Sequence, residues 1–455
     1  MKIFSNRAWL PSGWQENVRV TLDQGVVAGI EDNATAGTAD IRVDTLLPAL
    51  ANVHSHSFQR AMAGMTEFRA EGRDSFWTWR TLMYRFLDHL TPEHMEAIAA
   101  LVFMEMQEAG YASVGEFHYV HHQQGGRPYA NRAELSTRIL AAAAQTGIGL
   151  THLPVLYTYG GPNKAALSGG QCRFGNSVEE FSELLGVVEA EMTAMPGDTR
   201  LGIAPHSLRA TAPDELAEIV ARYGTGPIHM HIAEQPREVS EIADWLGERP
   251  VEWLLKHHDV RQNWCLIHAT HMTQTETTDL AESGAVVCLC PITEANLGDG
   301  PFNGPAYLEA GGAFGLGSDS NVRISLTEEL RSMEYSQRMR DLSRNVMVKS
   351  AGSVGKTLYL GAAAGGAQAL NRKAGKIEIG CLGDLAAIDS SHPLLCALHR
   401  DQLFDGLCFA ADDRVVSDVW SAGRHMVKGG RHIHRDRITA NYRHAIRDLT
   451  NAVNA

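Results

Sequence analysis

The sequence lacks the features of secreted, membrane-spanning and nucleic-acid-binding proteins. Its seven cysteines are an odd number without CxxC spacing, so a reduced, cytoplasmic protein is the simplest interpretation. It has no run of about 18 apolar residues, and no basic segment followed by an apolar stretch opens the chain as in a signal peptide. The net charge of -13 argues against nucleic acid or an anionic membrane as a partner, since both require a basic surface.

What is present is the composition of a large globular protein, with 44% apolar and 20% charged residues among 455. Short strands are predicted near both ends, at residues 2–4, 18–22, 26–30, 384–389, 415–422 and 424–427. We expect the two ends to pair into one small β-sandwich domain of residues 1–46 and 373–432. An amphipathic pattern predicts a C-terminal helix within residues 433–455.

Residues 47–372 alternate between short apolar runs and helical patterns. The eight apolar runs cover residues 45–53, 112–120, 148–157, 201–205, 227–231, 265–268, 285–291 and 313–316. Helical segments lie between most of them, as at 92–109, 178–194 and 213–223. Thr91 and Thr211 each precede a proline and early carboxylates, which is typical of a helix start with a capping hydroxyl. Eight strands alternating with helices predict an α/β fold, a (β/α)8 TIM-like barrel.

Polar residues able to bind metals or transfer protons follow many of these runs. In a parallel barrel, functional side chains gather at the carboxyl ends of the strands. The residues in such positions are His54, His56, Glu116, His118, Tyr119, His206, Arg209, His229, His231, Glu234, His268, His271 and Asp319. His54 and His56 alternate along one extended strand, so both imidazoles point to the same side and form half of a metal site.

These features resemble the amidohydrolase superfamily over essentially the whole chain, including the return of residues 375–389 to the terminal β domain. The resemblance implies a hydrolase in which one divalent metal is held by four ligands, namely His54, His56, His231 and Asp319. Zinc suits this ligand set, with Fe²⁺ or Mn²⁺ as alternatives. The run at 201–206 has no lysine of the kind that bridges two metals in binuclear relatives, which favours one metal. His229 shares strand parity with His231 and is a rival ligand.

The resemblance also assigns catalytic roles. Glu234 stands three residues after His231, and the same HxxE occurs in hydrolytic deaminases of the superfamily. We therefore expect Glu234 to protonate a leaving nitrogen, His268 to orient the attacking water and Asp319 to accept a proton while ligating. His271 is interpreted as a supporting residue.

The substrate must be inferred from other residues. Arg80, Arg209 and Arg323 are the arginines positioned to bind carboxylates, and Arg209 is the best placed. Residues 54–67, 76–80, 115–119 and 204–210 closely resemble the formiminoglutamate deiminases, a family that converts N-formimino-L-glutamate to N-formyl-L-glutamate and ammonia in histidine degradation. This resemblance implies a set of substrate contacts, namely Gln59, Arg80, Tyr119, His206 and Arg209. The residues directly after the histidine pair, especially Gln59 and Arg60, are interpreted as indicating the substrate more than the metal ligands do.

Two alternatives stay open. One is another deaminase, acting on a nucleobase or nucleoside of the guanine, cytosine or adenosine type, with the same metal site and a different pocket. The other is a non-enzymatic scaffold, which is disfavoured because every ligand and acid–base residue is present. Related enzymes also suggest a homodimer. We expect residues 67–87 to form a loop over the barrel mouth, serving its own site or that of a neighbouring subunit.

Overall fold

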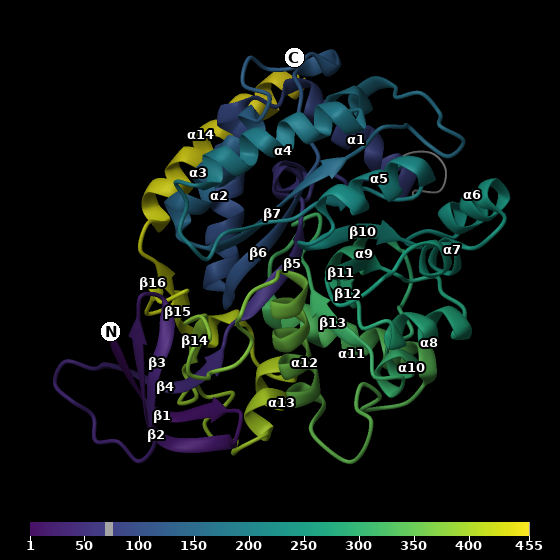
Figure 1. Cartoon of the computed structure of the whole chain (residues 1–455). Coiled ribbons are helices and arrows are strands. Elements are labelled where there is room, and N and C mark those ends of the chain that lie inside the picture. Colours follow the sequence, from purple (N-terminus) through teal and green to yellow (C-terminus); the bar gives the residue numbers. More distant parts are fainter. Residues whose placement is uncertain (69–75, 455) are drawn as a thin grey trace.

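The computed structural model describes residues 1–68 and 76–454, and two sheets carry its fold (Figure 1). A parallel sheet surrounded by helices forms the larger part. A second sheet, built from both ends of the chain, lies beside it with the N-terminus at the lower left of the view. This architecture confirms the predicted α/β barrel with a second unit from both termini. No helix in the described part of the chain is long and apolar enough to cross a membrane.

The barrel contains the eight predicted strand positions. In their order around the sheet, its strands are β10 (Ile228–Ile232), β11 (Trp264–His268), β12 (Val286–Leu289), β13 (Ala313–Leu316), β5 (Leu50–Ser55), β6 (Tyr111–His118), β7 (Gly149–Leu156), β8 (Arg200–Leu201) and β9 (Ala204–Pro205). Both β8 and β9 pair with β7 and share one strand position. The ring closes where the amide of Ile203 donates to the carbonyl of Pro227 at 2.9 Å. Since neighbouring strands run parallel, their carboxyl ends meet at one rim.

Helices follow most of the strands and cover the barrel (Figure 1). They are α2 (Pro92–Glu108), α3 (Glu134–Thr146), α4 (Val178–Met192), α5 (Pro213–Tyr223), α6 (Pro236–Leu246), α7 (Pro250–His257), α8 (Gln274–Glu282), α9 (Pro291–Leu297), α10 (Gly304–Glu309), α11 (Leu326–Asp341), α12 (Val354–Ala369) and α13 (Gln402–Phe409). Thr91 caps α2 as predicted, because its hydroxyl accepts from the amide of His94 at 3.3 Å. The expected cap of α5 by Thr211 is wrong. The hydroxyl of Thr211 instead donates to the carbonyl of Leu156 at 3.2 Å and so connects the loop before α5 to β7.

The first apolar run, residues 45–53, is divided between the two sheets. Strand β4 (Ile41–Pro48) pairs antiparallel with β14 (Leu385–Ile388) in the terminal sheet, whereas β5 belongs to the barrel. The chain changes sheet at Ala49, whose amide donates to the carbonyl of Asp384 at 3.0 Å. Both strands are buried here, so hydropathy alone shows one continuous run.

The terminal sheet joins strands from the two ends of the sequence. Its order is β17 (Arg431–His432), β16 (Arg424–Lys428), β15 (Val416–Ser421), β14, β4, β1 (Lys2–Leu10), β2 (Gly13–Asp23) and β3 (Val26–Glu31). The sheet curls so that its two ends approach each other. The amide of Gly383 donates to the carbonyl of Gly25, and the amide of Gly423 donates to that of Gly383. The core of this curled sheet includes Leu46 and Trp420, both fully buried. The domain limits predicted above stay a prediction.

Residues 67–87 are only partly a loop, so that expectation is wrong for their second half. Helix α1 (Phe76–His89) begins within this stretch, and residues 69–75, with Arg69 and Arg73, lie outside the described residues. The C-terminal helix α14 (Arg435–Asn454) packs against α1 and α2 (Figure 1). Its buried residues Ile438, Ala445 and Leu449 fall on one face, as the amphipathic pattern requires.

Candidate metal centre and active site

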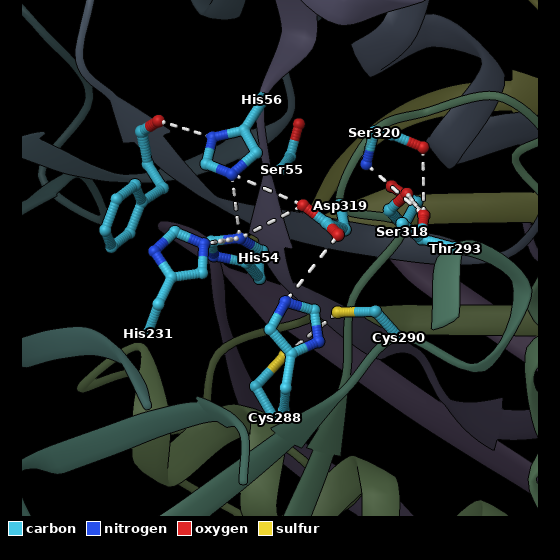
Figure 2. Close-up of polar contacts among 12 residues, drawn as sticks. His54, Ser55, His56, His231, Cys288, Cys290, Thr293, Ser318, Asp319 and Ser320 are labelled. Atoms are coloured by element: carbon cyan, nitrogen blue, oxygen red, sulfur yellow. Dashed lines mark hydrogen bonds and ion pairs between the residues drawn. The ribbon is translucent and has the colours of Figure 1, made fainter. Parts of the chain in front are cut away.

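Four side chains converge at the carboxyl-end rim of the barrel (Figure 2). They are the expected ligands His54, His56, His231 and Asp319, all buried, and their ligand atoms lie within 4.8 Å of one another. The Nε2 atom of His54 is 3.1 Å from Nε2 of His56 and 3.1 Å from Nε2 of His231. The Oδ1 atom of Asp319 lies 3.3 Å from Nε2 of both His54 and His56.

These spacings fit a single tetrahedral metal. A tetrahedron with ligand bonds of about 2.0–2.1 Å has edges of about 3.3 Å, which is close to the four separations given above. Burial lowers the pKa of His54, His56 and His231, so their imidazoles stay neutral at neutral pH. Neutral imidazole is the form that binds a metal. Three nitrogens and one carboxylate oxygen therefore form a donor set suited to a divalent ion.

Backbone contacts orient two of the imidazoles. Nδ1 of His56 donates to the carbonyl of Phe117 at 3.0 Å, and Nδ1 of His231 donates to the carbonyl of His206 at 3.2 Å. Each contact leaves Nε2 free to face the centre. Asp319 is held by the seam between β5 and β13, where its amide donates to the carbonyl of His54 and its carbonyl accepts from the amide of His56, both at 2.9 Å.

The backbone is in the left-handed region where the site residues leave their strands. Asp319 has φ of 47°, His268 has φ of 69° and Ala233, next to Glu234, has φ of 50°. Such conformations are costly for residues other than glycine and persist where the surroundings fix them. Here they turn the chain sharply at the barrel rim, so that consecutive residues aim into the site.

The rival ligand His229 does not belong to the metal centre. Its Nε2 atom donates to the carbonyl of Ala369 at 2.9 Å, below the rim. Although His229 and His231 share strand parity, only His231 stands at the end of β10. The residues at 201–206 contain no lysine, as the sequence shows.

His268 and Glu234 lie beside the metal ligands. Nε2 of His268 is 3.8 Å from Oδ2 of Asp319 and 3.9 Å from Oε1 of Glu234. Burial raises the pKa of Glu234 to about 7. Burial alone would lower the pKa of His268, but the neighbouring carboxylates raise it well above its ordinary value. The three groups form a buried acid–base cluster at the mouth of the barrel.

One cavity opens over this cluster and brings the predicted substrate contacts together. It is lined by Gln59, Arg80, Tyr119, His206 and Arg209, together with His56, His231, Glu234, His268 and Asp319. The amide of Gln59 donates to the hydroxyl of Tyr119 at 2.6 Å, which fixes both side chains. Arg80 enters from α1 and donates to the hydroxyl of Tyr84. The roles of these residues remain predictions, but their positions in one cavity are as expected.

Several lining residues had no assigned role in the sequence interpretation. These are Trp79, Met83, Tyr157, Phe174, Leu297 and Ser320. Tyr157 ends the predicted run 148–157 and Ser320 follows Asp319, so strand-end position alone indicated them. Phe174 and Leu297 come from segments without a distinguishing motif, and only the fold places them here.

Arg60 serves the framework and not the cavity lining, contrary to the weight given to it above. Its guanidinium donates to the carbonyls of Asn321 and Val322 at 2.9 and 3.0 Å and pairs with Glu105 at 2.8 Å. These contacts hold the loop that follows Asp319. Arg60 therefore supports a metal ligand, while its neighbour Gln59 faces the cavity.

Arg323 and His271 also lie outside the cavity lining. The side chain of Arg323 is 60% exposed and pairs with Glu328 at 2.6 Å, so it is a surface arginine. The backbone amide of His271 donates to the carbonyl of Ala233 at 3.0 Å and supports the turn before Glu234.

Comparisons with known proteins agree with this geometry. Residues 45–426 match the model of the family described as "Amidohydrolase family". The chain belongs to the amidohydrolase family. Residues 1–44 match a second model, "Formimidoylglutamate deiminase HutF, N-terminal domain". This amidohydrolase has a curated relative from Pseudomonas aeruginosa, "Formimidoylglutamate deiminase", which is 47% identical over 96% of both chains.

Other similar proteins include a more distant curated relative and two solved structures. A 5-methylthioadenosine/S-adenosylhomocysteine deaminase from Natronomonas pharaonis is 28% identical over 92% of this chain and 89% of its own. Among solved structures, an amidohydrolase from Brucella melitensis is 45% identical, covers 99% of both chains and has a TM-score of 0.94. A zinc-bound adenosine deaminase from Xanthomonas campestris has a TM-score of 0.81 at 20% identity over 99% of this chain and 98% of its own, which shows the fold alone.

Proposed function

We propose that the protein is a metal-dependent deiminase that hydrolyses N-formimino-L-glutamate to N-formyl-L-glutamate and ammonia, a step of histidine degradation. The observation that carries this proposal is that two arginines share one cavity with the metal ligands and with Glu234. The 47% identity to the P. aeruginosa formimidoylglutamate deiminase supports the same substrate.

The charge pattern of the cavity supports a dicarboxylate carrying an amidine-like group. Arg80 and Arg209 offer planar guanidinium groups, which bind carboxylates in a bidentate manner. Gln59, Tyr119 and His206 add hydrogen-bonding groups to the same cavity. The buried carboxylates of Glu234 and Asp319 also line it and would bind a cationic formimino group.

The acid–base cluster then has a role at each step. A divalent metal held by His54, His56, His231 and Asp319 would supply Lewis-acid activation of the attacking water. His268 orients the water, and Asp319 accepts the proton that the water loses as its oxygen bonds to the formimino carbon. Glu234 delivers a proton to the terminal nitrogen, and the bond between carbon and that nitrogen breaks. Ammonia leaves, Glu234 takes up the remaining proton of the hydroxyl group, and the formyl C=O forms.

Zinc as the metal, a homodimer and a cytoplasmic location belong to the same proposal. The three-histidine, one-aspartate donor set supports zinc, as does the zinc named for the X. campestris structure. The homodimer and the location are supported by the resemblance to related enzymes. One metal per subunit is expected from the single four-ligand cluster among the described residues and from the strand without lysine.

A substrate panel distinguishes this proposal from a nucleobase or nucleoside deaminase. Ammonia release would be measured with N-formimino-L-glutamate, N-formimino-L-aspartate, adenosine, guanine and cytosine. We expect kcat/KM for N-formimino-L-glutamate to exceed that for each nucleobase or nucleoside by at least about 1000-fold, because a site built for carboxylates leaves its charges unpaired with other substrates. Preferential turnover of any nucleobase or nucleoside would contradict the proposal.

A further inference from the structure

A carboxylate behind the acid–base cluster has no role in the mechanism above. Glu294 is buried, with 7% of its surface exposed, and stands in the first turn of α9. Its Oε1 atom lies 3.2 Å from Nδ1 of His268 and accepts from the backbone amide of Cys290 at 2.9 Å. Glu294 therefore contacts the Nδ1 edge of the His268 ring and does not itself line the cavity.

This contact places a proton on Nδ1 of His268. Because Oε1 of Glu294 already accepts from an amide, it is the acceptor in the contact with His268, and Nδ1 is the donor. Nε2 then faces Oδ2 of Asp319 and Oε1 of Glu234, at 3.8 and 3.9 Å. The left-handed backbone of His268, with φ of 69°, makes such an external restraint on the ring more important.

The same turn of α9 also holds the loop that carries Asp319. The hydroxyl of Thr293, beside Glu294, donates to the carbonyl of Ser318 at 3.2 Å and contacts the hydroxyl of Ser320 at 3.0 Å. Figure 2 shows Thr293 beside the two serines that flank Asp319. One helical turn thus fixes His268 and Asp319 relative to each other.

His268, Cys290 and Glu294 also have ligand atoms within 4.8 Å of one another, as a second metal site would. Hydrogen bonds already account for this arrangement. Oε1 of Glu294 is occupied by the amide of Cys290 and by His268, and Sγ of Cys290 lies 3.9 Å from Sγ of Cys288. A positioning role therefore explains the cluster without a second ion.

We propose that Glu294 is a positioning residue, which accepts a hydrogen bond from Nδ1 of His268 and so presents Nε2 to the reacting water. The inference rests on the proposed function, because it assigns the nitrogen of His268 that faces the reacting water. It adds to the metal ligands and substrate contacts a residue that must hold the ring of His268 in place. A carboxylate behind a metal-bound histidine commonly affects activity by about 10- to 100-fold, and we expect a comparable effect for His268.

The test compares variants of Glu294 with a matched control, a second buried glutamate that lies on α11 and contacts the same turn of α9. Glu329 is also buried and its Oε2 accepts from the amide of Ile292 in the first turn of α9 at 2.9 Å, without touching His268. We expect Glu294→Ala to lower kcat by about 10- to 100-fold with KM within about twofold. Glu294→Gln, which keeps the acceptor oxygen, is expected to recover kcat to within about fivefold of the wild type. Glu329→Gln should leave kcat within about threefold.

Three results would overturn the positioning role. They are a kcat for Glu294→Ala close to that of the wild type, a loss confined to KM, and an equal loss in Glu329→Gln. Metal analysis adds a fourth, since two equivalents in the wild type and one in Glu294→Ala would favour a second metal site.

A readout without substrate separates this inference from the proposed function. In ¹⁵N-histidine spectra, with His268→Asn used for assignment, His268 of the metal-loaded wild type should be protonated at Nδ1. A proton only at Nε2 would contradict the inference. Because this spectrum is recorded on the wild type, it tests the inference even if Glu294→Ala fails to fold. Absence of turnover of N-formimino-L-glutamate by the wild type would contradict the proposed function alone.

Discussion

Removal of the Arg209 guanidinium should weaken substrate turnover, because the contact with one of the two substrate carboxylates is lost. Only 8% of the Arg209 surface is exposed, and the side chain lines the cavity over the metal ligands. Truncating one partner of a buried, hydrogen-bonded charge pair costs about 2–4 kcal/mol, and 1.36 kcal/mol corresponds to tenfold in rate. We therefore expect Arg209→Ala to lower kcat/KM for N-formimino-L-glutamate by about 30- to 900-fold.

The assay uses substrates that each lack one carboxylate. N-formimino-L-glutamine has no side-chain carboxylate, and N-formimino-γ-aminobutyrate has no α-carboxylate. If Arg209 binds one of the two groups, wild type and Arg209→Ala should differ by less than about threefold with the substrate that lacks it, while the full loss persists with the other. The same cycle with Arg80→Ala should single out the opposite carboxylate.

Arg323→Ala is the matched control for both variants. This arginine also follows a barrel strand, but its side chain is 60% exposed and pairs with Glu328. We expect its kcat/KM to stay within about threefold of the wild type, as for other exposed ion pairs. Two results would refute the carboxylate assignment: Arg209→Ala with unchanged kcat/KM, or an equal loss with the parent and both truncated substrates.

Three further predictions concern the metal, the pH dependence and the junction of the two sheets. His231→Ala should hold less than about 0.2 equivalents of metal after dialysis, because three remaining donors bind far more weakly; stoichiometric metal by mass spectrometry would contradict the four-ligand centre. Burial lowers the pKa of His152 to about 3, so protonation of the unfolded state below about pH 6.5 destabilises the fold by about 2 kcal/mol at pH 5. His152→Leu should therefore lose less thermal stability than the wild type between pH 7.5 and 5, and equal losses in calorimetry would show that His152 does not contribute. Arg372 is buried and pairs with Asp198 at 3.1 Å and with Asp384 at 2.9 Å. Arg372→Met should lower the free energy of unfolding by about 3–5 kcal/mol, and unchanged unfolding in urea would refute that estimate.

Periodicity and strand-end position were sufficient to predict the barrel and the rim at which the candidate site residues meet. Neighbouring strands of the barrel run parallel, so the residues that follow their carboxyl ends come together at one rim. His54 and His56 also share one strand face, and this spacing can be recognised without a structure. The resemblance to a known superfamily then selected His231 over His229.

Other features depend on tertiary contacts that leave no local pattern. The change of sheet at Ala49 is hidden because β4 and β5 are both buried, and hydropathy cannot show which neighbour each strand has. Thr211 follows the pattern of a helix cap, yet a carbonyl of β7 takes its hydroxyl. Arg60 follows the substrate-facing Gln59, but its guanidinium reaches carbonyls more than 250 positions away in the sequence.

The central claim is that the terminal C–N bond of the formimino group is cleaved at a metal centre. The most direct measurement is hydrolysis of N-formimino-L-glutamate with a ¹³C-labelled formimino carbon and a ¹⁵N-labelled terminal nitrogen, followed by NMR and an ammonia assay. The account predicts one equivalent of ¹⁵N-ammonia for each labelled N-formyl-L-glutamate, and loss of both products after the metal is removed by chelation. Free glutamate with labelled formamide, or unchanged turnover by metal-free protein, would contradict it.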